Sequence, residues 1–144
     1  MVTRLTAETT MLRSLLGVAV GGAVGLGAIY GWQLLGHQIF PQLSGIDPTD
    51  PLKRMVLVNS MSFAARSWVV AGYAVGVVVG GFLANLIADA RWPSVALAMT
   101  TAGVFFGTLT FAPHPFWMQL TGILLPLLAG LGIAARVGRR TLDG

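Results

Sequence analysis

Long intervals without charged side chains dominate the pattern of apolar and polar positions. Three stand out: between Arg13 and Asp47, between Arg66 and Asp89, and across residues 92–135. A charged side chain at mid-bilayer costs several kcal/mol, and a hydrocarbon core about 30 Å thick takes about 20 helical residues to cross. The first two intervals therefore predict one transmembrane helix each, at about 14–36 and 67–88.

The third interval predicts two crossings. It holds 44 residues, and a single helix of that length would be roughly twice as long as the bilayer is thick. Pro113, His114 and Pro115 break it, because prolines remove backbone donors and disfavour helix at the preceding residues. We expect the third and fourth spans at about 93–112 and 116–135.

The loop between the first two spans contains a helix start at Asp50 and Pro51. The carboxylate can cap free amides, and proline suits the first helical position. A helix over 51–62 would be amphipathic, since Leu52, Met55 and Val56 recur at helical spacing among polar residues. Such a segment suits the membrane surface, and a helix that binds a partner subunit would have the same pattern.

Glycines spaced four apart predict how the helices pack. They form lines of small residues, namely Gly17, Gly21 and Gly25; Gly72, Gly76 and Gly80; and Gly103 and Gly107. Four residues is just over one turn, so each line is a groove where another backbone can approach closely. We predict an all-α membrane protein, a single membrane domain over 1–144 with four transmembrane helices packed through glycine and small-residue grooves. Packing within the chain is the favoured use of these grooves, and self-association or docking to another membrane protein is the alternative.

Composition agrees with a membrane protein and excludes several functions. Hydrophobic residues make up 55% of the chain and charged residues 10%, against about 25% charged in soluble domains. The absence of cysteine excludes disulfides, thiolate catalysis and cysteine-based metal sites. The net charge of +4 comes from Lys and Arg at the borders of apolar runs, a pattern that does not favour nucleic-acid binding.

The basic residues predict an orientation. With four spans, six arginines fall on the side of both termini (Arg4, Arg13, Arg91, Arg136, Arg139 and Arg140), and three basic residues fall on the other side (Lys53, Arg54 and Arg66). The positive-inside rule then places both termini in the cytoplasm. Tryptophans near the span edges indicate interfacial anchors, with a stacking platform for a ligand as the alternative: Trp32, Trp68, Trp92 and Trp117.

The spans offer little chemistry. They hold no ionisable residue near the midplane, so we expect no catalytic residue, no cofactor and no ion pump. Asn85 is expected to form a hydrogen bond between helices. His37 and His114 fall on the same outer side near Asp47 and Asp50, where they could hold zinc or haem, although nothing in their spacing requires it.

Two short motifs carry a family resemblance. Residues Gly36-His37-Gln38-Ile39-Phe40-Pro41 follow the first span, and Pro113-His114-Pro115-Phe116-Trp117 precede the last. In these motifs the chain resembles a group of small bacterial four-helix inner-membrane proteins of uncharacterised activity. The resemblance implies multi-pass placement in the bacterial inner membrane and carries over no activity.

These observations lead to one functional hypothesis and two alternatives. The absence of chemistry, the many small-residue grooves and the amphipathic loop favour a non-catalytic accessory subunit that packs against a larger membrane assembly, such as a photosynthetic or respiratory one. The first alternative is a homo-oligomeric channel or small-solute permease. The second is an outer-face metal or haem site at His37 and His114.

Overall fold

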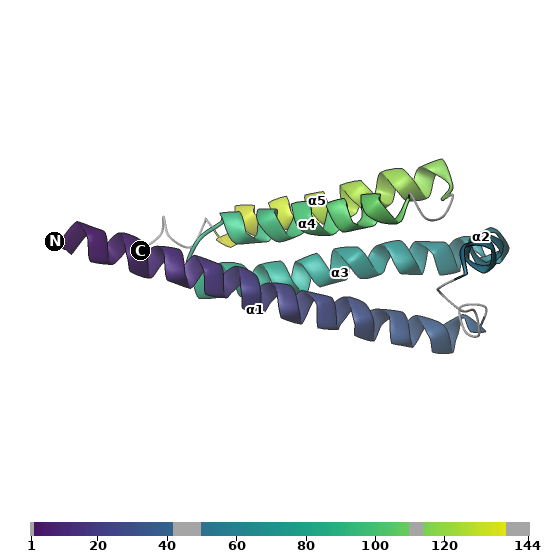
Figure 1. Cartoon of the computed structure of the whole chain (residues 1–144), viewed down its shortest axis with the longest axis horizontal. Coiled ribbons are helices and arrows are strands. Elements are labelled where there is room, and N and C mark those ends of the chain that lie inside the picture. The colour runs from purple at the N-terminus through teal and green to yellow at the C-terminus, as the bar shows by residue number, and fades with distance from the viewer. Residues whose placement is uncertain (1, 42–49, 110–113, 138–144) are drawn as a thin grey trace.

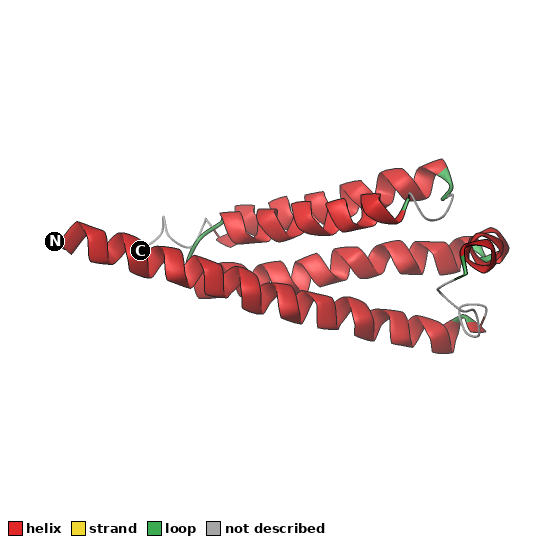
Figure 2. Cartoon of the chain, in the orientation of Figure 1, coloured by secondary structure: helices red, strands yellow, loops and turns green. Residues whose placement is uncertain are grey.

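The computed structural model describes residues 2–41, 50–109 and 114–137, and this part of the chain is helical throughout, apart from short connections (Figure 2). Its helices are α1 (Val2–Ile39), α2 (Pro51–Ser60), α3 (Phe63–Ala88), α4 (Trp92–Thr108) and α5 (Phe116–Val137). The four longer helices run along the length of the molecule, and α2 crosses one end of the bundle (Figure 1). The start of α1, the turn between α3 and α4 and the end of α5 lie toward the opposite end.

Three of the helices are long and apolar enough to cross a membrane. The qualifying segments are Thr10–Ile39 with 30 residues, Phe63–Ala88 with 26 and Phe116–Arg136 with 21. Helix α4 has only 17 residues, so it reaches about 25 Å against a hydrocarbon core of about 30 Å. The membrane-helical character is confirmed, and a crossing by α4 stays a prediction. The last residues of its predicted span, 110–112, lie outside the described residues.

Side-chain caps define the segment at the α2 end of the bundle. The Asp50 Oδ1 atom accepts hydrogen bonds from the backbone N–H groups of Leu52 at 2.9 Å and Lys53 at 3.4 Å, as expected for a helix that starts there. Helix α2 ends at Ser60, two residues before the expected limit. The reason is Ser62, whose hydroxyl accepts from the Ala65 N–H at 3.2 Å and caps α3.

Helix ends extend beyond the apolar runs that predicted them. Helix α1 begins at Val2 instead of 14, because the residues before Ser14 include no glycine or proline to stop it. Helix α3 begins at Phe63 instead of 67 and so includes Arg66, whose Nη2 donates to the Asn59 carbonyl at 3.2 Å. Charge limits the apolar segment that a bilayer can hold, whereas caps and breakers limit the helix itself.

Helices α3, α4 and α5 share a hydrophobic core. Val70, Phe105 and Met118 are buried together, with Tyr73 packed edge-on against Phe105 at a centroid distance of 5.3 Å. The Phe105 ring lies directly over Gly122 of α5, where a Cβ atom would collide with it. Helix α1 lies outside this core and joins the bundle chiefly through α3.

Candidate functional site

Helices α1 and α3 run antiparallel and meet backbone to backbone. Three pairs of small residues face one another: Gly17 with Ala84, Gly21 with Gly80, and Gly25 with Gly76. A Cβ atom added to Gly17 would lie 2.6 Å from the carbonyl oxygen of Ala84, and one on Gly25 would lie 2.8 Å from that of Gly76. Since real Cβ atoms do not approach oxygen so closely, only glycine fits at these positions.

A pair of tryptophans closes this interface at the end near α2. The Trp32 Nε1 donates to the Trp68 carbonyl at 2.9 Å, and the Trp68 Nε1 donates to the Trp32 carbonyl at 3.0 Å. Their rings are stacked, with centroids 4.3 Å apart. Gly72 makes room for the pair, because its Cβ would lie 2.8 Å from Trp32 Cδ1. Both indoles therefore have partners inside the chain, which the expectation of interfacial anchors did not include.

The other two tryptophans lie at helix starts. Trp92 opens α4 and is exposed, whereas Trp117, in the first turn of α5, is half-buried with its ring 4.8 Å from that of Phe63. Within the described residues, neither of them forms a stacked pair like that of Trp32 and Trp68.

The expected packing of Gly103 and Gly107 differs from the structure. Cβ atoms added to them would meet nothing within 4 Å among the described residues, since Gly103 is exposed and Gly107 half-buried. Another line spaced by four faces the bundle instead, formed by the buried residues Ser94, Ala98 and Ala102. The spacing of glycines does not indicate this line, because serine and alanine, which also permit close approach, form it.

Asn85 of α3 and Ser94 of α4 together link three helices. Its Nδ2 donates to the Ser94 hydroxyl at 2.9 Å, and its Oδ1 accepts from the Ser94 N–H at 2.9 Å. The Ser94 Oγ lies 3.1 Å from the Gly130 carbonyl of α5 and 3.1 Å from the Arg91 carbonyl, and its single proton can be donated to either. Both Asn85 and Ser94 have 0% exposure, so the expected interhelical bond of Asn85 is confirmed.

Gly130 and Gly81 pack around this same network. A Cβ on Gly130 would lie 2.8 Å from the Ser94 carbonyl oxygen, and one on Gly81 would lie 3.0 Å from Ser94 Cβ. A spacing of four in the sequence indicates this position, because Gly122, Pro126 and Gly130 recur every four residues. All three are buried in α5.

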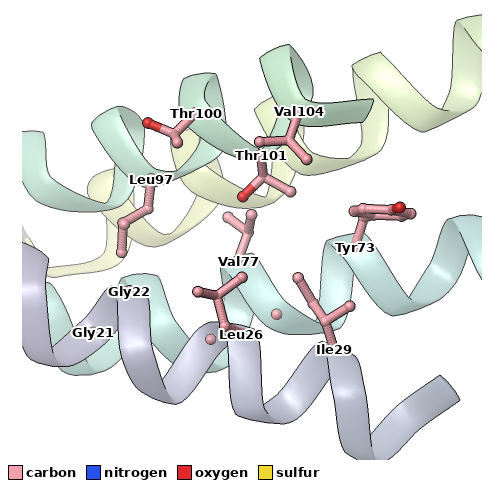
Figure 3. Close-up of a pocket in the computed structure, with 12 residues that line it drawn as sticks. Gly21, Gly22, Leu26, Ile29, Tyr73, Val77, Leu97, Thr100, Thr101 and Val104 are labelled. Atoms are coloured by element: carbon pink, nitrogen blue, oxygen red, sulfur yellow. The ribbon is translucent and has the colours of Figure 1, made fainter. Parts of the chain in front are cut away.

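A half-open cavity lies between α1, α3 and α4 (Figure 3). Its volume is about 350 Å³, and its lining is almost entirely carbon. Helix α1 contributes Gly21, Gly22, Gly25, Leu26 and Ile29; α3 contributes Tyr73, Gly76 and Val77; and α4 contributes Leu97, Thr100, Thr101 and Val104. The cavity arises because the glycines of α1 leave space on the side that faces α4.

The two histidines belong to different elements. His37 is exposed in the last turn of α1, whereas His114 precedes α5, half-buried, with its ring 6.0 Å from that of Phe105. Asp50 caps α2, and Asp47 lies outside the described residues. Within the described ranges, no group of three His, Asp or Glu side chains is close enough to hold a metal ion.

The described site is thus a set of helix contacts and one apolar cavity. In comparisons with known proteins, the chain matches no protein-family model, no curated protein and no solved structure.

Proposed function

We propose that the chain is a non-catalytic subunit with four membrane crossings that packs, through the outer face of α1, against a larger membrane protein assembly such as an energy-transducing one.

A second line of small residues on α1 carries the proposal. Ala19, Ala23, Gly27 and Gly31 are spaced by four, two positions along from the glycines that contact α3. Two positions are about 200° around a helix, so this line lies nearly opposite the first. Cβ atoms on Gly27 and Gly31 would meet nothing within 4 Å in the described chain.

Lipid alone does not account for such a line. Glycine in a helix interior costs about 1 kcal/mol relative to alanine, and flexible lipid tails pack against alanine or leucine equally well. A neighbouring helix does benefit, because small residues let two backbones approach and gain contact area. The exposed Gly103 on α4 extends the same argument to a second outer face.

Cysteine cross-linking tests the proposal, and the natural absence of cysteine makes single replacements unambiguous. We expect Gly27→Cys, treated in native membranes with a short thiol-reactive cross-linker, to give adducts with a different membrane protein. Val78→Cys is the matched control, since Val78 is an exposed apolar residue of α3 away from this line. Its adducts should be several-fold fewer.

The same experiment separates the channel or permease alternative. Disulfide-linked dimers of Gly27→Cys as the main product, together with solute flux in liposomes that contain only this protein, would favour a homo-oligomeric channel. Equal cross-linking at Gly27→Cys and Val78→Cys would contradict docking through the outer face of α1.

A further inference from the structure

The cavity between α1, α3 and α4 contains a hydroxyl group that the helix does not use. Three threonines of α4 and α5 donate to carbonyls of their own helix: Thr100 to Ala96 at 3.0 Å, Thr108 to Phe105 at 2.6 Å, and Thr121 to Trp117 at 2.7 Å. Such bonds are the usual arrangement for threonine in a membrane helix. Within the described chain, the Thr101 hydroxyl makes no such hydrogen bond. Its oxygen points into the cavity, whereas the hydroxyl oxygen of Thr100 points away from it (Figure 3).

The cavity lies at half the height of the bundle. Gly25, Gly76 and Thr100, which line it, are at or next to the midpoints of Thr10–Ile39, α3 and α4. At that depth in a bilayer water is scarce, so a free hydroxyl is costly unless a ligand provides an acceptor. The carbonyl groups of phospholipids lie near the membrane surfaces and are too far away to do so.

We propose that this cavity binds a small apolar ketone dissolved in the membrane, whose carbonyl oxygen accepts a hydrogen bond from the Thr101 hydroxyl. The volume of about 350 Å³ is within the range of small-molecule sites. The carbon-rich lining suits an apolar skeleton, and the ring of Tyr73 forms one end (Figure 3). This site does not depend on the docking face of α1, because Gly27 and Gly31 do not line it.

Photolabelling with benzophenone tests the proposal, since benzophenone is a small apolar ketone that reacts with nearby C–H bonds on irradiation. The full-length protein in lipid nanodiscs is equilibrated with it, irradiated and mapped by peptide mass spectrometry. We expect adducts concentrated on the less exposed lining residues Ile29, Val77 and Leu97. Thr101→Val keeps the side-chain shape and removes the donor, so labelling should fall about three- to tenfold.

Two further variants provide the controls. Thr121→Val removes a hydroxyl that bonds within α5 and should label like the wild type. Gly22→Leu should abolish labelling by filling the cavity. Its Cβ would lie 3.5 Å from Leu97 Cδ2, which is an ordinary contact. Size-exclusion profiles identical to the wild type show that each variant is folded.

Two results would overturn the site. Adducts spread evenly over the exposed apolar residues of all helices would mean that the cavity has no preference for the probe. Wild-type labelling of Thr101→Val, combined with its loss in Gly22→Leu, would mean that the cavity takes plain hydrocarbon such as a lipid chain, and that the ketone is not recognised.

Discussion

At the scale of single residues, Asn85 and Ser94 are the polar contacts on which the packing of α3, α4 and α5 depends. The side chain of Asn85 satisfies both a hydroxyl and a backbone amide that are shut off from solvent. Hydrogen bonds between membrane helices average about 0.6 kcal/mol. Asn85 makes two such bonds from one fully buried amide, and the Ser94 hydroxyl can donate to the carbonyl of Gly130 or of Arg91.

We expect Asn85→Ala to lower the free energy of unfolding by about 1–3 kcal/mol, because it leaves the Ser94 N–H buried without an acceptor. Unfolding in mixed micelles with increasing dodecyl sulfate measures the loss. Thr100→Val is the control, since its hydroxyl is exposed and bonds within its own helix, and it should change stability by less than about 0.5 kcal/mol. An Asn85→Ala variant as stable as this control would contradict the role given to the network.

The sequence predicted that Asn85 bonds another helix, but not which one. Its partner depends on the turn at Asp89, a left-handed residue with φ of 49°, which brings Ser94 back to face α3. Asparagine and aspartate adopt this conformation more readily than most residues. An aspartate at position 89 is consistent with this turn. The distance between Asn85 and Ser94, however, depends on how α3 and α4 pack together, which the sequence does not show.

At the scale of elements, the spacing of glycines predicted the contacts between α1 and α3, whereas Gly103 and Gly107 of α4 have no such contact among the described residues. Lines of four-residue spacing occur on more than one side of these helices, and sequence alone does not rank the sides. In α4 the inner line is Ser94, Ala98 and Ala102, while Gly103 and Gly107 face outward. The apolar runs predicted that the long helices exist. The residues at which α2 and α3 begin are set by the caps at Asp50 and Ser62.

We expect Gly21→Ala to destabilise the α1–α3 pair by about 1–3 kcal/mol, because the added methyl group would meet the Gly80 carbonyl and force the backbones apart. Gly27→Ala adds the same group to the same helix where nothing lies within 4 Å among the described residues. That control should be neutral or slightly stabilising, since alanine favours helix over glycine. Thermal unfolding in detergent compares the two, and equal melting temperatures would contradict the close backbone contact.

At the scale of the whole molecule, the two ends of the helix bundle carry different sets of basic residues. Arg13, Arg91 and Arg136 belong to segments toward one end of the bundle, whereas Lys53 and Arg54 of α2 and Arg66 in the first turn of α3 belong to segments at the other (Figure 1). Helix α4 is short, yet it packs lengthwise beside α5, and exposed apolar side chains such as Met99, Val104 and Phe106 cover its outer side. The proposed topology of four crossings, with both termini in the cytoplasm, rests on the count of basic residues in the sequence.

Cysteine accessibility in intact cells that produce the protein checks the proposed topology. We expect a membrane-impermeant maleimide added outside the cells to label Asn59→Cys, in the exposed part of α2. Arg136→Cys, in the last turn of α5, should react only after the membrane is disrupted. Labelling of both from the same side would mean an odd number of crossings, and the reverse pattern would mean the opposite orientation.

The indole pair at the end of α1 and α3 has a consequence for how the two helices find their alignment. Glycines repeating every four residues would allow one helix to slide by a turn, about 6 Å, and still meet small neighbours. The reciprocal bonds of Trp32 and Trp68 can form at a single offset only. The repeat allows the two helices to come together, and the tryptophans act as the stop that selects one alignment from several nearly equivalent ones.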